Sequence, residues 1–367
     1  MVFLFFYAIG FTNAIARDRF FRYDQDMENG LSDRITRINN ELADFAASWI
    51  EIFRGNQKPV VKREQLAKIL DPGMDLINRG GKRWRPLLMQ LCCEMAGGGD
   101  RALPFTPVVE IAHNGTLIAD DIEDNSEMRR GEKTIHLKYG LDMALNTGNF
   151  MCFLPSLIIE KSTLLLEQKL QVFKYYLEDL RNLHIGQGLD IQWHNDYDYM
   201  PSQEEYFYMC SLKTGTLARM AARLGILIGC GSEKLANQTG LICENFGVGF
   251  QIIDDVKNLT TGNPGKKTGD DIIEGKKSLP VILYSQKPGA RTGDIIEIFK
   301  AFSNKRAAHP DTAITEVIKL LTESGSIREA GDIAFRMINS AIKEIQMQFP
   351  ASEALSLLLN LFSGLYS

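Results

Sequence analysis

Asp120-Asp121-Ile122-Glu123-Asp124 places four carboxylates within five residues, and Arg129-Arg130-Gly131 follows shortly after. The segment before it, Val108-Val109-Glu110-Ile111-Ala112-His113, is mostly apolar and typical of a helix. On one continuous helix, offsets of three, four and seven residues define one stripe: His113, Thr116, Leu117, Asp120 and Asp124. Two carboxylates one turn apart on this stripe repel each other unless a cation lies between them. For this motif alone, a solvated charged face is the alternative interpretation.

A second acidic cluster, Gln251-Ile252-Ile253-Asp254-Asp255-Val256-Lys257-Asn258, has the same helical spacing. Its polar stripe lies among apolar neighbours and contains Gln251, Asp254, Asp255 and Asn258. Burying two carboxylates in such surroundings is costly unless cations or hydrogen-bond donors meet them. Oxygen ligands without a Cys or His set favour Mg²⁺ over zinc, and Mg²⁺ usually shares its coordination with substrate phosphates.

Basic residues gather in four other places. Gly80-Gly81-Lys82-Arg83-Trp84-Arg85-Pro86 puts three cations at a helix start, which is a favourable position for an anion. The other sets are Arg129 and Arg130, Lys213-Thr214-Gly215-Thr216, and the lysines 266, 267, 276 and 277. Each set alone is open to interpretation as solvated surface charge. Together they predict two phosphorylated substrates, one bound through metal and one bound directly.

The hydrophobic periodicity predicts an all-α protein, a large helical bundle. Ser32-Asp33 is expected to cap a first helix that runs to Trp49, a second helix spans 62–78, and a third opens at Trp84-Arg85-Pro86. Later helical segments are expected at 136–160, 163–195, 203–230, 233–260 and 310–348, with a final apolar segment after Pro350. No alternating strand pattern bounded by hairpin turns is found. Residues 31–367 are expected to form a single domain.

Residues 1–30 are set apart as an N-terminal apolar extension. Met1 to Ala16 contains no charged residue and is too short for a comfortable transmembrane helix. Ala14-Ile15-Ala16 resembles a signal cleavage site, but a positive n-region is missing. Targeting, a start-site artefact and a loose, disordered extension remain open alternatives, and no stable membrane span is expected.

Composition excludes some function classes. The 367 residues are 45% hydrophobic and carry a formal net charge of −5, so a sizeable core is expected and a nucleic-acid partner is not. The six cysteines have no metal-ligand spacing. We therefore expect reduced, mostly buried thiols and a cytoplasmic location.

These motifs together resemble the trans-isoprenyl diphosphate synthase (polyprenyl synthetase) family, and in particular its geranylgeranyl-type members. The match covers roughly residues 33–345 and rests on five ordered motifs: Gly80 to Pro86 (GGKRxRP), Asp120 to Asp124 (DDxxD), Gly186-Gln187-Gly188-Leu189-Asp190, Lys213-Thr214, and Phe250 to Asp255. The resemblance implies an isoprenoid synthase fold with a central cavity between the two acidic helices, usually as a homodimer. It also implies Mg²⁺-dependent elongation of an allylic diphosphate with isopentenyl diphosphate.

The resemblance implies residue roles by matching positions. The metal set would be Asp120, Asp121, Asp124, Asp254, Asp255 and Asn258. Isopentenyl diphosphate would bind Lys82, Arg85, His113 and Arg130, and the allylic diphosphate would bind Arg129, Lys213, Thr214, Gln251, Lys266 and Lys276. Many relatives have aspartate where this chain has Asn258, but geranylgeranyl-type eukaryotic enzymes also carry Asn there. We therefore do not interpret Asn258 as a loss of activity.

Product length in this family depends on the residues one turn before the first acidic motif, here Gly115 and Thr116. Farnesyl-type members carry aromatic residues there, so these small residues predict geranylgeranyl diphosphate or a longer product. A longer-chain polyprenyl diphosphate synthase for quinone side chains is the nearest alternative. A non-catalytic regulatory subunit is a second alternative, although both aspartate pairs and the Lys82/Arg85 set are intact. A terpene cyclase is disfavoured because it needs no second diphosphate site.

Overall fold

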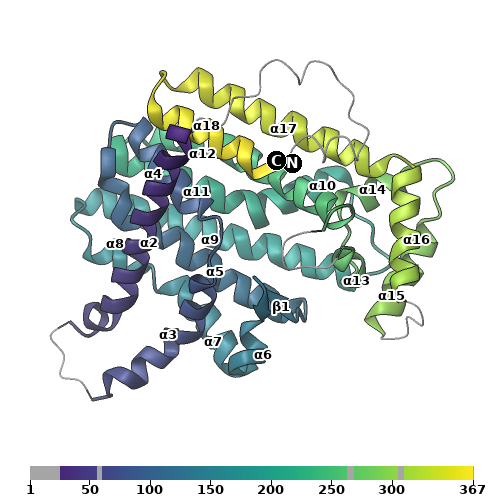
Figure 1. Cartoon of the computed structure of the whole chain (residues 1–367), viewed down its shortest axis with the longest axis horizontal. Helices are drawn as coiled ribbons and strands as arrows, with labels where there is room; N and C mark the ends of the chain where they lie inside the picture. Colours follow the sequence, from purple (N-terminus) through teal and green to yellow (C-terminus); the bar gives the residue numbers. More distant parts are fainter. Residues whose placement is uncertain (1–24, 56–59, 263–267, 305–309, 367) are drawn as a thin grey trace.

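The computed structural model describes residues 25–55, 60–262, 268–304 and 310–366, and this part of the chain is almost entirely helical (Figure 1). Its strands are one two-residue hairpin, Met128–Arg129 (β1) paired antiparallel with Glu132–Lys133 (β2). The prediction of an all-α bundle is confirmed. None of the helices in the described ranges combines the length and apolarity needed to cross a membrane.

The first third of the chain forms α2 (Gln25–Arg54), α3 (Arg63–Asn78), α4 (Trp84–Met95), a 3₁₀ helix (Gly99–Phe105) and α5 (Thr106–Glu123). The expected cap at Ser32-Asp33 is wrong, because α2 begins at Gln25 and continues through both residues. Residues 25–30 therefore belong to α2. The rest of the predicted N-terminal extension, residues 1–24, lies outside the described residues.

The middle of the chain contains α6 (Ile135–Tyr139), α7 (Leu141–Phe153), α8 (Ser156–Lys161) and α9 (Leu166–Asn195). The single helix expected at 136–160 is wrong, because two breaks divide it. Gly140 has a φ of 93°, outside the helical region, and Pro155 cannot donate the hydrogen bond that would continue α7 into α8.

The segment expected at 203–230 is α10 (Gln203–Cys210), a π-helical turn (Ser211–Gly215) and α11 (Thr216–Cys230), and it leads to α12 (Glu233–Asn258). The sequence reading missed the C-terminal helices α13 (Asp270–Ile273), α14 (Leu279–Ser285) and α15 (Thr292–Ser303). The segment expected at 310–348 is two helices, α16 (Pro310–Glu323) and α17 (Ser326–Gln348), because Gly325 has a φ of 76°. The chain continues as α18 (Glu353–Tyr366).

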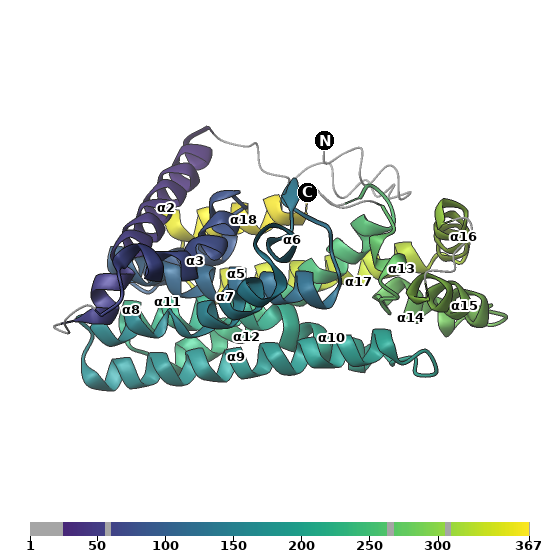
Figure 2. The same cartoon turned by 90° about the horizontal axis from the view of Figure 1, so that it is seen from below.

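Helix α11 lies at the centre of the bundle and packs on α4, α9 and α12. Gly225 makes the contact with α4 possible, since a Cβ there would collide with the carbonyl oxygen of Met89. Figure 2 shows α9 running along one edge of the molecule, next to α11 and α12. Helix α5 packs on α7 instead, so α5 and α9 belong to different walls of the bundle.

A buried ionic network joins α9 to α11 and α12. Arg219 contacts both Asp179 and Glu244, and Arg223 contacts Asp179 at 3.2 Å and packs its guanidinium 3.6 Å from the ring centre of Tyr175. Burial raises the pKa of Asp179 to about 6. Breaking such a pair leaves an uncompensated buried charge, so this network fixes the register of α9 against α11.

All six cysteines are free, and only Cys230 is exposed. This agrees with the expectation of mostly buried thiols.

Candidate active site

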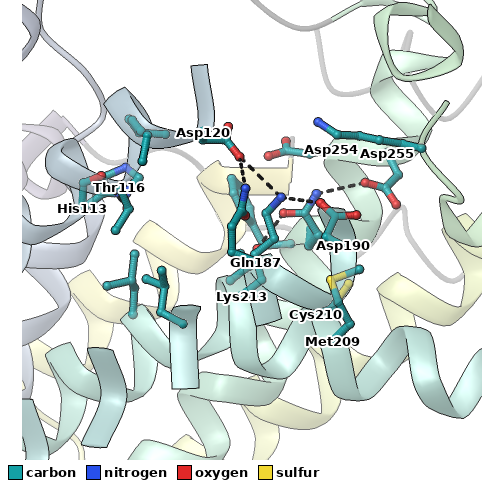
Figure 3. A pocket seen from close by; sticks show the side chains of 18 of the residues that line it. His113, Thr116, Asp120, Gln187, Asp190, Met209, Cys210, Lys213, Asp254 and Asp255 are labelled. Carbon is teal, nitrogen blue, oxygen red and sulfur yellow. Dashed lines mark hydrogen bonds and ion pairs between the residues drawn. The ribbon is translucent and has the colours of Figure 1, made fainter. Parts of the chain in front are cut away.

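A cavity of about 470 Å³ lies between α5 and α9, α10, α11 and α12 (Figure 3). The start of α4, the hairpin and residues 271–278 complete its lining. The cavity therefore brings together every cationic set and both acidic motifs that the sequence singled out, within the residues that the structure describes.

The α5 wall of the cavity follows the predicted stripe: His113, Thr116, Leu117 and Asp120 all line it. Asp124 is the residue that ends α5, and its side chain is bound by Lys276 at 2.8 Å. Asp121 points to the other side, where its buried carboxylate accepts a hydrogen bond from Nε of Arg129 at 2.8 Å. Of the three predicted α5 ligands, Asp120 is thus the one that faces the cavity directly.

The α12 wall presents Gln251, Asp254 and Asp255 to the cavity. Tyr206 donates to Asp255 at 2.5 Å, and Gln251 bridges Asp255 to Thr214 with bonds of 2.9 and 2.8 Å. Burial raises the pKa of Asp254 to about 6 and also raises the pKa of Asp255. These two carboxylates therefore favour any additional positive charge that enters the cavity.

Asn258 does not line the cavity. It is buried, and its side-chain oxygen lies 3.3 Å from the backbone nitrogen of Asp271, from which it accepts a hydrogen bond. It anchors the segment after α12 in this structure, whereas the sequence assigned it to the metal set.

One lysine and one glutamine of this region bridge the walls. Lys213 lies 2.5 Å from Asp190 and 3.5 Å from Asp120. Burial opposes its charged form, but these carboxylates raise the pKa of Lys213 above its usual value. Gln187 donates to Asp120 at 3.0 Å and to Glu123 at 2.7 Å.

Gln187, Asp190 and Tyr206 are cavity residues to which the sequence analysis gave no role. The motif Gly186 to Asp190 was the available signal for the first two. A Cβ on Gly186 would collide with the backbone at Leu212 and Lys213, so this glycine lets α9 approach the π-helical turn that carries Lys213.

The residues present fit a hard divalent cation. Asp120, Asp124, Asp254 and Asp255 offer only carboxylate oxygens, the ligands that Mg²⁺ and Ca²⁺ take. The described residues contain no ready-made group of three or more Asp, Glu, His or Cys ligands. Burial raises the pKa of Asp124 as it does for the α12 pair, so the carboxylates on both walls favour added positive charge. Lys213 and Lys276 supply part of that charge in this structure.

A separate cationic region lies at the start of α4. Lys82, Arg85 and Arg130 line it, with His113 from α5. The Arg85 guanidinium lies 3.2 Å from Nε2 of His113 and 4.4 Å from the ring centre of Trp84, and its buried Nε has no hydrogen-bond partner within the described chain. Burial and the nearby Arg85 charge lower the pKa of His113, so this histidine is neutral. An unsatisfied buried arginine donor beside other cations is suited to an anion.

Arg83 departs from the expectation of three cations aimed at one anion. Its side chain is buried and pairs with Glu110 at 2.7 Å and with the carbonyl of Ile77 at 2.5 Å. Its φ of 49° turns the chain so that Lys82 and Arg85, but not Arg83, line the cavity. This arginine therefore supports the turn before α4.

The hairpin that carries Arg129 and Arg130 is held from α3. Arg79 donates to the carbonyls of Arg129 and Lys133 at 3.3 and 2.8 Å, and its guanidinium is fixed by Asp75 at 3.1 Å. Lys138 and Tyr139 bind the same carboxylate at 2.7 and 2.9 Å. Asp75 thus holds together Arg79, Lys138 and Tyr139, and Arg79 in turn binds the hairpin.

We expect the contribution of Asp75 to stability to depend on pH. Burial alone would raise the pKa of Asp75, but hydrogen bonds from Arg79, Lys138 and Tyr139 lower it from 3.8 to about 2. Between pH values of about 2 and 3.8 the unfolded state binds more protons at this carboxylate than the folded state does. The free energy of unfolding therefore rises with pH in this range. Urea denaturation of the wild type and Asp75→Asn should show a larger difference in unfolding free energy at pH 6 than at pH 3. An equal difference in unfolding free energy at the two pH values would contradict this prediction.

Gly115 does not face the cavity, although the sequence placed it there with Thr116. A Cβ on Gly115 would lie 2.8 Å from both the carbonyl oxygen of Gly148 and the Cβ of Met151 on α7. Gly115 therefore serves the close contact of α5 with α7, and Thr116 is the predicted chain-length residue that lines the cavity. Lys266, a predicted ligand of the allylic diphosphate, lies outside the described residues.

Comparison with known proteins identifies a family whose model matches most of this chain. The model of the family described as "Polyprenyl synthetase" matches residues 67–317. The chain is 34% identical to a geranylfarnesyl diphosphate synthase from Aeropyrum pernix, over 78% of this chain and 90% of the relative. It is 35% identical to a geranylgeranyl pyrophosphate synthase from Eremothecium gossypii, over 61% of this chain and 72% of the relative.

Among solved structures, a polyprenyl synthase from Caulobacter crescentus complexed with calcium and isoprenyl diphosphate has the same fold. Its TM-score is 0.75 at 24% identity, with 93% of this chain and 96% of that chain covered. This likeness confirms the architecture expected from the motifs.

Proposed function

Because the chain belongs to the polyprenyl synthetase family, we propose that it elongates an allylic diphosphate with isopentenyl diphosphate and releases geranylgeranyl diphosphate. It is a trans-prenyltransferase. The observation that supports this function is one cavity with two groups of charged side chains, a carboxylate–lysine group between α5 and α12 and an arginine group at α4.

The proposed binding roles are those that the family resemblance implies. The diphosphate of the allylic substrate would contact Arg129, Lys213, Thr214, Gln251 and Lys276, while Lys82, Arg85, His113 and Arg130 would hold isopentenyl diphosphate. Lys266 stays in the allylic set as a proposal from the sequence. Preorganised cations stabilise the additional negative charge that develops on the leaving diphosphate as the carbon–oxygen bond breaks.

The chemistry needs no side-chain nucleophile. Ionisation of the allylic carbon–oxygen bond leaves a carbocation, and the double bond of isopentenyl diphosphate attacks it. The new bond transfers the positive charge to the isopentenyl unit, which loses a proton to an oxygen of the released diphosphate. Leu117, Leu183 and Leu217 are apolar residues of the same cavity lining and would exclude water from the cation.

A divalent cation accompanies this activity in the family, and we propose that it is Mg²⁺. When bound, it would add positive charge to the leaving diphosphate. Asp120, Asp124, Asp254 and Asp255 would hold it. Asp121 and Asn258 remain proposed members of the set, and their observed partners, Arg129 and the backbone of Asp271, would have to exchange for metal or water.

A product assay tests the function. Purified protein with Mg²⁺, labelled isopentenyl diphosphate and each of three allylic primers should give a single twenty-carbon product after dephosphorylation. A ladder that reaches thirty carbons would instead support a longer-chain synthase for quinone side chains. No product with any primer would support a non-catalytic regulatory subunit, although both carboxylate pairs and the Lys82/Arg85 set are present.

Thr116→Phe is expected to shorten the main product to fifteen carbons, because an aromatic ring would fill the cavity one turn below Asp120. Gly115→Ala should instead lower the unfolding free energy by about 1–3 kcal/mol, since its Cβ overpacks the α5–α7 contact, and should leave product length unchanged. Thin-layer chromatography and urea denaturation measure the two effects. A shorter product from Gly115→Ala, or an unchanged one from Thr116→Phe, would contradict this assignment.

We further propose a cytoplasmic homodimer in which each chain acts as one domain, with the boundary expected at residue 31 moved so that the domain includes all of α2. Exposed apolar side chains on α7 support a second copy as the partner: Leu141, Leu145 and Phe153 are 58%, 49% and 69% exposed. Light scattering on the purified chain tests this assembly, and a monomer at micromolar concentration would refute it.

A further inference from the structure

Two side-chain bridges cross the space between α9 and the α5–α7 pair. The upper bridge is Gln187, which donates to Asp120 and Glu123 at the charged end of the cavity. The lower bridge is Tyr176, whose hydroxyl donates to the carbonyl oxygen of Cys152 on α7 at 2.6 Å. No extensive backbone packing joins α9 to α5 or α7 within the described residues, so side chains fill the space between these bridges.

Tyr176 is not itself a lining residue, but it lies on the face of α9 that lines the cavity. Offsets of four, three and four residues place Tyr176, Leu180, Leu183 and Gln187 on one face of α9. Leu183 and Gln187 line the cavity, so the same face leads from the charged end down to Tyr176. The eleven residues from Tyr176 to Gln187 correspond to a rise of about 16 Å.

The position of the hydrogen bond between Tyr176 and Cys152 can also be compared with positions along α5. Met151 lies against Gly115, and Cys152 is the next residue of α7. The carbonyl that holds Tyr176 is therefore about level with Gly115, one position beyond the cavity-lining Thr116. Cys152 is one of the last residues of α7, where helix carbonyls lack a partner within the helix, so the tyrosine satisfies an otherwise orphaned acceptor.

We propose that Tyr176 is the floor of the tail cavity and the residue that stops chain growth. The proposal rests on the prenyl-elongation function proposed above and identifies its specificity determinant. Leu180 and Leu183 are aliphatic and can change rotamer to admit a growing apolar tail. The Tyr176 ring cannot, because it is buried and held at both ends, by its backbone on α9 and by its hydroxyl on α7.

The α7 side of the cavity offers no comparable ring at this level. Phe153 is mostly exposed, and Phe150 packs with its ring centre 5.5 Å from that of Trp49. The ring that closes the tail space is therefore contributed by α9. The predicted chain-length residues Gly115 and Thr116 lie on the opposite wall, on α5.

Product length in Tyr176 variants tests the proposal. With labelled isopentenyl diphosphate and a fifteen-carbon primer, Tyr176→Leu is expected to raise the fraction of product longer than that of the wild type by about tenfold, since each added unit gains apolar contacts. Tyr176→Phe retains the ring and should keep the wild-type product. Tyr175→Leu is the matched control, because the neighbouring buried ring packs on Arg223 outside the tail space.

A second variant covers the case in which Tyr176→Leu does not fold, as judged by circular dichroism and melting temperature. Leu180→Phe adds a ring one turn above the floor and should shorten the product relative to wild type. A folded Tyr176→Leu with wild-type product length would overturn the proposal, as would an unchanged product from Leu180→Phe. Wild-type protein that makes no twenty-carbon product would refute the proposed function alone, because the shifts are measured relative to whatever the wild type makes.

Discussion

Asp120→Asn is expected to lower kcat/KM by about 10²–10³-fold, the loss seen when one charge-stabilising group is removed from an active site. Asp120 is the proposed metal ligand of α5 that lines the cavity, and it lies 3.5 Å from Lys213 and 3.4 Å from Arg129. Asparagine keeps the size and the bond with Gln187 but removes the negative charge that would hold a divalent cation beside the leaving diphosphate. Steady-state rates over a range of Mg²⁺ concentrations measure the effect.

Glu123→Gln is the matched control for this prediction. Glu123 lines the same cavity and accepts from the same Gln187, but it is not a proposed metal ligand. We expect it to change kcat/KM by less than about tenfold, as for a charge outside the reacting groups. Equal losses from both variants would mean that the carboxylates act only through the overall charge of the cavity. A fully active Asp120→Asn would remove Asp120 from the metal set.

Helical spacing along α5 and α12 predicted much of the cavity lining, although Asp124 and Asn258 of the same stripes do not line the cavity. His113, Thr116, Leu117 and Asp120 line the cavity as the stripe on α5 requires, and Asp254 and Asp255 face them from α12. These are local periodicities, so a sequence reports them directly.

What the sequence did not predict depends on the neighbours of each residue. Gly115 and Thr116 are adjacent and both small, yet one contacts α7 and the other lines the cavity, because α7 approaches α5 at Gly148. Arg83 and Arg85 are two residues apart, yet the left-handed backbone at Arg83 sends its side chain to Glu110. Tyr176 was overlooked because its sequence neighbours carry no motif, and its partner is a backbone carbonyl on another helix. Such contacts are set by helix packing, which spacing along one helix does not encode.

Arg85→Met is expected to raise the KM for isopentenyl diphosphate by about 10²-fold, as when one partner of a buried charge pair is truncated. The KM for the allylic substrate should change little. Arg85 is half-buried, lies 3.2 Å from the neutral His113, and has a buried Nε donor without a hydrogen-bond partner among the described residues. Burial lowers the pKa of Arg85 to about 10, so the guanidinium remains charged at neutral pH but is favoured by a bound anion. Initial rates with each substrate varied in turn separate the two KM values.

Three further arginine variants separate binding from stability. Arg83→Met should lower the unfolding free energy by about 3–5 kcal/mol, because it leaves Glu110 buried without its partner, and should affect both KM values alike. Arg181→Met, at an exposed position of α9, should change neither stability nor KM. Arg85→Lys keeps the charge but loses the planar fork, so it should recover only part of the affinity. If Arg85→Met instead raised the KM of the allylic substrate, the two diphosphate regions would have to be exchanged, because the cation beside His113 would then serve the leaving group.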